Sequence, residues 1–216
     1  MAGHTQALGV LLPPPNGNAY FLGVIESIYT STREFGYDAL ISFTPVPESG
    51  DFGEAVHALE ARQVEGLIAY SLGGQFEDHE RTHGPVSFPV IHLSAEPHQS
   101  ASVVTIDEIA GGYQATRHLT DLDHRKIACL CPEAYVDPWQ LREHGYLRAM
   151  EEVGEEPIFF GTSPTSGADA RTACSEMLEQ RPDVTAIFAR NDLVALGVLS
   201  ALNDVGIRVP KVTSPH

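Results

Sequence analysis

Basic residues are scarce in this sequence. Its 216 residues include 13 lysines and arginines against 29 aspartates and glutamates, which gives a formal net charge of −16 with neutral histidines. Such an acidic surface repels the phosphates of nucleic acids, so we expect this segment to bind DNA or RNA poorly by itself. Cysteine is scarce as well, and three cysteines argue against a disulfide framework and fit a reducing cytoplasm.

Long apolar runs are also missing. No run approaches the ~20 residues that a membrane-spanning helix needs. The first residues lack the basic stretch and apolar stretch of a secretory signal. We therefore expect a cytoplasmic protein that makes no membrane contact.

Most catalytic motifs are missing too. The sequence contains no G-x-S-x-G, no P-loop and no G-x-G-x-x-G, and no nucleophile is paired with a base at a readable spacing. We therefore expect no enzymatic activity and no cofactor.

One catalytic-looking motif is present. The run from His79 to His83, His-Glu-Arg-Thr-His, has the H-E-x-x-H form of zinc proteases. In those enzymes it lies on a long helix with an apolar face, whereas here the flanks GGQFED and GPVS are typical of loops. No third ligand follows at a suitable spacing. We therefore predict a short surface connection without a metal site, which leaves only adventitious zinc binding open.

Short β-rich runs alternate with helical patterns along the chain. Apolar and β-branched runs predict strands over residues 7–12, 38–43, 66–70, 88–93, 102–106, 126–131, 157–162 and 185–189. Apolar residues at helical spacing predict helices over residues 21–35, 52–59, 108–121, 139–153, 168–180 and 193–205. This alternation is typical of βαβ units and parallel sheets.

The alternation breaks at a polar link, Asp121 to Asp123. We therefore predict an α/β protein with two doubly wound parallel-sheet subdomains, residues 7–121 and 122–216. Ligands of open parallel sheets bind outside the carboxyl ends of the strands. Two such subdomains facing each other would make a cleft that can close on a ligand.

Several of the predicted strand ends carry motifs that resemble the lactose-repressor (LacI/GalR) family of bacterial transcription regulators. The matching segments are LGVLLP at residues 8–13, RQVEGLIAYS at 62–71, IDE at 106–108, LDHRKIACL at 122–130, Arg142 with Gly145-Tyr146, and residues 185–210. The last segment, TAIFARNDLVALGVLSALNDVGIRVP, is the most specific of them.

The resemblance implies a type I periplasmic-binding-protein-like fold that binds a small effector and forms a homodimer. It also implies that DNA is bound only through a separate helix-turn-helix headpiece, which these residues do not include. The sequence departs from the family at Ala19, where proline is expected, and at Ser94-Ala95, where an Asp-Arg pair is usual. The tail at residues 211–216 also departs, so we expect the second subdomain to be C-terminally truncated.

The family match places several polar residues where they would contact the effector. Arg142 is expected to hold two ligand oxygens, because a guanidinium forms a planar fork of donors. Asn18 and Asn191 are expected to contact the ligand as well. Asp192 is expected either to contact the ligand or to cap the following helix, and both roles can coexist.

Aromatic residues and further polar residues complete the predicted site. Tyr20 could stack on the apolar face of a sugar. Phe21 is a weaker candidate, because it begins the apolar stripe of a helix. Asp107 is equally suited to ligand binding and to helix capping. Ser71 is correctly placed but carries little signal, and Trp139 could either wall the cleft or pack.

These features favour a regulator's effector-binding core that senses a small sugar or related polyol without turning it over. The run His118-Leu119 followed by Leu122 to Ile127 is typical of repressors. The alternative is a periplasmic sugar-binding protein of a transporter, which would share the fold. An enzyme is the third hypothesis, and only the H-E-x-x-H run supports it.

Overall fold

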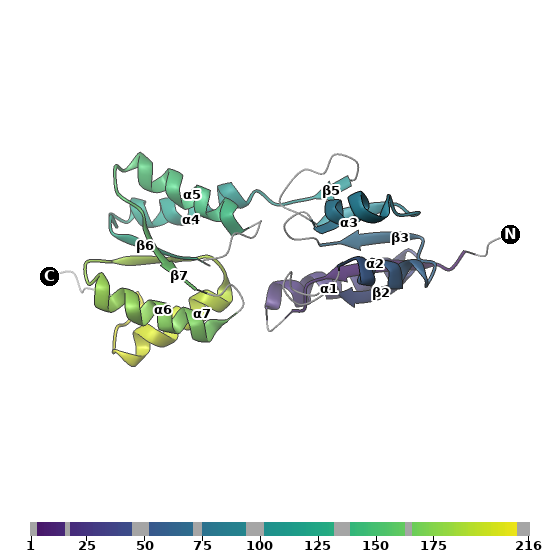
Figure 1. The fold of residues 1–216 in the computed structure, drawn as a ribbon. Helices are drawn as coiled ribbons and strands as arrows, with labels where there is room; N and C mark the ends of the chain where they lie inside the picture. The colour runs from purple at the N-terminus through teal and green to yellow at the C-terminus, as the bar shows by residue number, and fades with distance from the viewer. Residues whose placement is uncertain are drawn as a thin grey trace. The chain divides into compact units, whose positions relative to one another are not determined.

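The computed structural model describes residues 4–15, 18–44, 52–70, 75–93, 102–131, 139–162 and 166–210 (Figure 1). The chain divides into two compact units, Met1–Ile106 and Asp107–His216. Each unit has a parallel sheet with helices packed against it. The predicted fold class, two α/β units with parallel sheets, is therefore confirmed.

Unit 1 is built on five parallel strands in the order β2-β1-β3-β4-β5. The strands are β1 Ala7–Leu12, β2 Asp38–Phe43, β3 Gly66–Ala69, β4 Val90–Leu93 and β5 Ser102–Val104, and the helices are α1 Ala19–Glu34, α2 Phe52–Glu60 and α3 Gln75–His83. Three successive residues of β1, Val10 to Leu12, are fully buried, as expected for a strand covered on both faces. Leu11 packs in one cluster with Val56 of α2 and Phe76 of α3.

Unit 2 has three described strands in the order β7-β6-β8. The strands are β6 Ile127–Cys131, β7 Ile158–Gly161 and β8 Ala186–Ala189, and the helices are α4 Glu108–Asp121, α5 Trp139–Glu152, α6 Gly167–Gln180 and α7 Asp192–Asp204. The central strand β6 alternates its side chains between two cores. Leu130 packs with residues of α6 and α7, whereas Cys129 and Cys131 pack with Tyr146 of α5. Both thiols are free and buried, in keeping with a packing role.

Two glycines let the helices α4 and α5 pack closely, side by side in Figure 1. A Cβ atom on Gly112 would overlap the backbone carbonyl of Arg142, and one on Gly145 would overlap the backbone at Ile109 and Tyr113. Glycine is therefore required on each helix where the two backbones meet. This contact gives Gly145, which the family motif places three residues after Arg142, a structural purpose.

The boundary between the units corrects the sequence-based prediction. The structure divides the chain after Ile106, whereas the polar link at Asp121 to Asp123 suggested residues 7–121 and 122–216. Helix α4 belongs to unit 2 because it packs against α5. The polar link at Asp121 to Asp123 thus belongs to the connection between α4 and β6 and does not separate the two units.

The segment with the H-E-x-x-H run corrects a second prediction. It is the helix α3 rather than an irregular connection. Phe76 is buried, and His79 and His83 follow it at helical spacing. Phe76, His79 and His83 form one face of this helix. The hydrophobic pattern did not indicate that face, because two of these three residues are histidines, which count as polar.

Candidate functional site

In unit 1, the carboxyl end of β1 leads into α1 through Asn18. The Asn18 side chain caps this helix, since its Oδ1 accepts a hydrogen bond from the backbone N–H of Tyr20 at 3.0 Å. This contact fixes the side chain of a residue predicted to bind ligand. The hydrogen bond occupies the side-chain oxygen of Asn18, so its amide N–H groups are the donors that a ligand would meet.

Three aromatic rings follow the ends of β1 and β3. Tyr20 has 54% of its surface exposed and packs edge-on against Phe21, with 5.3 Å between ring centroids. Phe21 is buried and packs edge-on against Tyr70, also at 5.3 Å. Phe21 therefore contacts both the exposed ring of Tyr20 and the ring of Tyr70. Tyr70 was not predicted from the sequence as a site residue, although it directly follows β3, and ligand residues are often found at the ends of such strands.

In unit 2, Arg142 lies in the first turn of α5, and each of its three guanidinium nitrogens donates a hydrogen bond within this unit. Its Nε and Nη2 donate to the two carboxylate oxygens of Glu108, the latter at 2.9 Å. Its Nη1 donates to the backbone carbonyl of Arg190, just past β8, at 2.7 Å. The Glu108 side chain is 8% exposed and that of Arg142 26%. The fork geometry predicted for a ligand is thus present, with Glu108 in the place of the ligand oxygens.

A second ion pair adjoins the first. Arg190 Nη1 donates to Glu143 Oε1 at 2.6 Å, and the Arg190 side chain is only 2% exposed. Burial lowers the pKa of the Arg190 guanidinium, and the charge of Glu143 opposes that shift. Two arginines and two glutamates therefore form a charge-balanced group, which we call the ionic quartet: Glu108, Arg142, Glu143 and Arg190.

Of the ionic quartet, only Arg142 was predicted from the sequence as a site residue. Glu108 had a signal, because an acidic residue at the start of a helix interacts favourably with the helix dipole. Arg190 had one as well, because it directly follows a strand. The pairing itself had none, since Glu108 and Arg142 are separated by 34 residues.

The remaining polar candidates cap helices. Asn191 caps α7 by accepting the N–H of Val194 at 2.9 Å, and Asp107 caps α4 by accepting the N–H of Ala110 at 2.8 Å. Asp192 is exposed and is the first residue of α7. The capping role suggested for Asp192 therefore belongs to Asn191, and the Asp192 carboxylate projects from the first turn of the helix.

Two predicted site residues lie wholly or partly outside the described residues. Ser71 is one of them, and Trp139 begins α5 but its side chain is not described. Among the described residues, no three His, Cys, Asp or Glu side chains are arranged to hold a metal ion as they stand. No helix in the described ranges is both long and apolar enough to cross a membrane.

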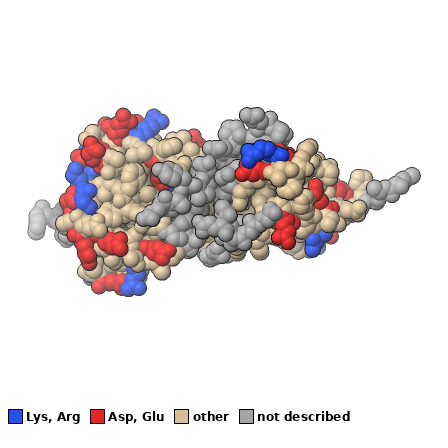
Figure 2. All heavy atoms as spheres, in the orientation of Figure 1, with Lys and Arg blue, Asp and Glu red and all other residues tan. Residues whose placement is uncertain are grey.

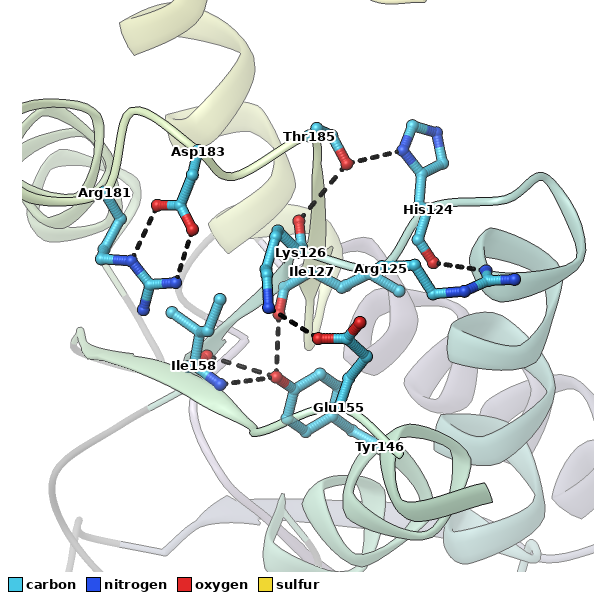
Figure 3. A network of polar contacts seen from close by, with 10 residues as sticks. All are labelled: His124, Arg125, Lys126, Ile127, Tyr146, Glu155, Ile158, Arg181, Asp183 and Thr185. Carbon is cyan, nitrogen blue, oxygen red and sulfur yellow. Dashed lines mark hydrogen bonds and ion pairs between the residues drawn. The ribbon is translucent and has the colours of Figure 1, made fainter. Parts of the chain in front are cut away.

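A polar network at the opposite, amino-terminal edge of the unit 2 sheet holds α5 in place (Figure 3). Tyr146, one turn after Arg142, inserts its hydroxyl between two strands. That hydroxyl accepts the N–H of Ile158 and donates to the carbonyl of Ile127, both at 2.8 Å. Burial raises the pKa of Tyr146 to about 12. Nearby, Lys126 and Glu155 form an ion pair at 2.6 Å. Since Tyr146 and Arg142 share one helix, this anchor also fixes the position of the guanidinium.

Similar proteins agree on one family. The chain is 26% identical over 209 residues to the HTH-type transcriptional repressor PurR of Haemophilus influenzae, covering 96% of this chain and 62% of that repressor. A LacI-family regulator of Corynebacterium glutamicum is 25% identical, with a TM-score of 0.75 over 96% of this chain and 74% of that one. The regulator CelR in complex with cellobiose is 25% identical, with a TM-score of 0.77, over 96% of this chain and 65% of that one.

The chain therefore spans less than two thirds of the length of the repressor PurR. Residues 5–213 match the family described as periplasmic binding proteins and sugar binding domain of LacI family. This match covers both units and all of the predicted site. The protein belongs to that family.

Proposed function

We propose that this chain is the effector-binding and dimerisation core of a LacI-type bacterial transcription regulator that acts in the cytoplasm. A small sugar or related polyol is its effector, and binding occurs without turnover. DNA is bound by a helix-turn-helix headpiece outside these 216 residues. The regulator names of the similar proteins favour this function over that of a transporter's periplasmic sugar-binding protein.

The ionic quartet carries the proposal of an uncharged effector. Arg142 and Glu108 already neutralise each other, as do Arg190 and Glu143. An anionic ligand would have to displace the Glu108 carboxylate or bind beside it against charge repulsion. Either one costs free energy in a partly buried site. A sugar hydroxyl can accept from a guanidinium and donate to a carboxylate at the same time. Hydroxyl-rich, neutral molecules therefore suit this group best.

Tyr20 adds a feature of carbohydrate sites. Its ring is exposed and packs edge-on against buried Phe21, so an aromatic face is accessible to a ligand. Such faces pack well against the apolar C–H face of a sugar ring. We propose that Tyr20 contributes in this way and that Asn18, Asp107, Asn191 and Asp192 contribute polar contacts, together with Ser71, Phe21 and Trp139.

A ligand screen tests this function. Thermal-shift assays followed by calorimetry would cover neutral mono- and disaccharides, including ribose and cellobiose, uronic acids, sugar phosphates and nucleobases. We expect a neutral sugar or polyol to bind and to be recovered unchanged. Tight binding of nucleobases or of anionic sugars alone would contradict the proposed effector class and leave the fold unaffected.

Homodimerisation is supported by apolar side chains that unit 1 leaves exposed. The strand β2 lies at an edge of the sheet and exposes Ile41 and Phe43, while α1 exposes Tyr29. Exposed apolar edge strands promote association. Sedimentation equilibrium is expected to show a dimer that is weakened by Phe43→Lys. A monomer at all concentrations would contradict this part of the proposal.

The charge pattern is consistent with DNA binding from outside this chain. On the face drawn in Figure 2, lysine and arginine side chains are scattered among acidic and uncharged ones in both units. Nucleic-acid surfaces instead gather basic side chains into a patch. The residues encoded next to this segment discriminate the alternatives, because a helix-turn-helix indicates a regulator and a signal peptide a transporter protein.

A further inference from the structure

Three histidines of unit 1 form a cluster between two helices. His57 belongs to α2, and His79 and His83 belong to α3. The distances between ring centroids are 5.4 Å from His57 to His79, 5.2 Å from His57 to His83, and 4.8 Å from His79 to His83. The H-E-x-x-H run thus gains a third imidazole from a different helix, twenty-two residues before its first histidine in the sequence, which no spacing rule would find.

The packing of the two helices places this cluster. Phe52 of α2 and Phe76 of α3 meet edge-on at 6.0 Å, and both rings are buried. His79 lies over them and is 5% exposed, whereas His57 and His83 are exposed. The cluster therefore has a fixed inner imidazole and two outer imidazoles that solvent and ions can reach.

The separations match those of imidazoles around a single ion. With zinc–nitrogen bonds of about 2.0–2.1 Å and tetrahedral angles, the centroids of two coordinating rings lie roughly 5 Å apart. The three observed separations are 4.8, 5.2 and 5.4 Å. The three ring separations are therefore close to those expected around one ion.

The ring orientations are not yet those of a bound site. His79 and His83 lie nearly parallel, with 24° between their planes, and among the described residues no three donors converge on an ion as they stand. Rotation of the rings about their own bonds is what binding requires. That rotation involves little core packing for His57 and His83, because both side chains are exposed.

A carboxylate beside the cluster supports the assignment. Glu60 Oε2 lies 3.0 Å from His57 Nδ1. Histidines that bind metals usually donate their second ring N–H to a carboxylate or carbonyl, which fixes the tautomer. A hydrogen bond from Nδ1–H to Glu60 leaves Nε2 of His57 as the free donor for an ion.

We propose that His57, His79 and His83 bind one divalent d-block cation of the zinc class. Imidazole ligands favour zinc, copper and nickel over magnesium and calcium. The ion joins α2 to α3. Its role is structural, because α3 has only nine residues and is shorter than the long helix that carries the H-E-x-x-H motif in zinc proteases. This site is independent of the effector site proposed above.

The experiment is calorimetric titration of ZnCl₂ into the metal-free chain, in a buffer that does not chelate metals. We expect one zinc ion per chain and a zinc-dependent rise in the melting temperature. His57→Asn and His83→Asn should each weaken binding and abolish that rise. Glu60→Gln should weaken binding by about tenfold, less than either ligand substitution. Both ligand variants change exposed residues and should remain folded.

His118→Asn is the matched control, because His118 is an exposed histidine on α4 of unit 2. It should leave zinc affinity and the melting temperature shift unchanged. Co²⁺ substituted for zinc should give the intense visible absorption of a tetrahedral site. Absence of binding would overturn the proposal, and so would binding that survives either His57→Asn or His83→Asn at full affinity.

Discussion

Arg142 and Glu108 form a two-point ion pair that joins the first turn of α5 to the first turn of α4. The two helices meet at Gly112 and Gly145, where the absence of a side chain lets their backbones come into contact. A positive charge near a helix N-terminus is unfavourable by itself, and the buried Glu108 carboxylate compensates it. The residue with the strongest case for ligand binding is therefore also part of the unit's internal support, and an effector must share it with Glu108.

This double role gives Arg142 two separate effects. Arg142→Ala leaves Glu108 buried without its guanidinium, so the free energy of unfolding should fall by about 3 kcal/mol. Effector binding should weaken by about 1.5–3 kcal/mol as well. Arg142→Lys should recover only part of either loss, because an ammonium cannot reproduce the fork. Urea unfolding and calorimetry measure the two effects separately.

The double variant Arg142→Ala/Glu108→Gln is the control. It should unfold at a higher urea concentration than Arg142→Ala, since no unpaired carboxylate remains buried. Effector affinity that is unchanged in Arg142→Ala would show that the guanidinium only supports the structure of unit 2.

Neighbouring glycines of α4 test the helix contact. Gly112→Ala should destabilise unit 2 by about 3 kcal/mol, because the new methyl group overlaps the Arg142 carbonyl and the helices must separate. Gly111→Ala has open space around it and should stabilise α4 by about 0.5–1 kcal/mol. Opposite shifts of the urea midpoint are therefore expected from substitutions one residue apart. Similar shifts would refute the close contact of α4 with α5.

The buried Tyr146 hydroxyl should contribute more to the free energy of unfolding than the hydroxyl of Tyr113. Tyr146→Phe leaves the N–H of Ile158 without its acceptor, so the free energy of unfolding should fall by about 1–3 kcal/mol. Tyr113, whose hydroxyl donates to exposed Glu152 at 2.8 Å, is the matched control. Tyr113→Phe should change stability by less than about 0.5 kcal/mol. Equal losses would argue against the strand anchor drawn in Figure 3.

Stability should also respond to alkaline pH through Tyr146. Burial raises its pKa to about 12 in the folded state, above about 10 in the unfolded chain. The folded state then holds its proton more tightly, so this contribution is complete below pH about 10 and is lost as pH rises towards about 12. Urea midpoints of the wild type should therefore fall more steeply over that window than those of Tyr146→Phe. Parallel curves would mean that Tyr146 ionises normally.

The sequence by itself determined the class of fold and all the described helices and strands except α3. The apolar runs at residues 7–12 and 38–43 coincide with β1 and β2, and the helical spacing at 108–121 coincides with α4. These patterns are local, because a strand or helix buries side chains at a fixed period along the chain. The family motifs also placed Arg142 and Asn191 at the carboxyl edge of their sheet, since strand ends are legible in the sequence.

Only the tertiary structure decided which residues meet. In the structure α4 belongs to unit 2, and the Arg142 guanidinium pairs with Glu108. The segment that contains His79 and His83 is a helix. The tertiary structure also brings His57 to those two histidines. Each of these outcomes depends on contacts between residues far apart in the chain, which leave no period in the sequence. Burial of Phe76 against α2 forms α3, and the glycines at 112 and 145 bring α4 to α5, so packing rather than local propensity determined both.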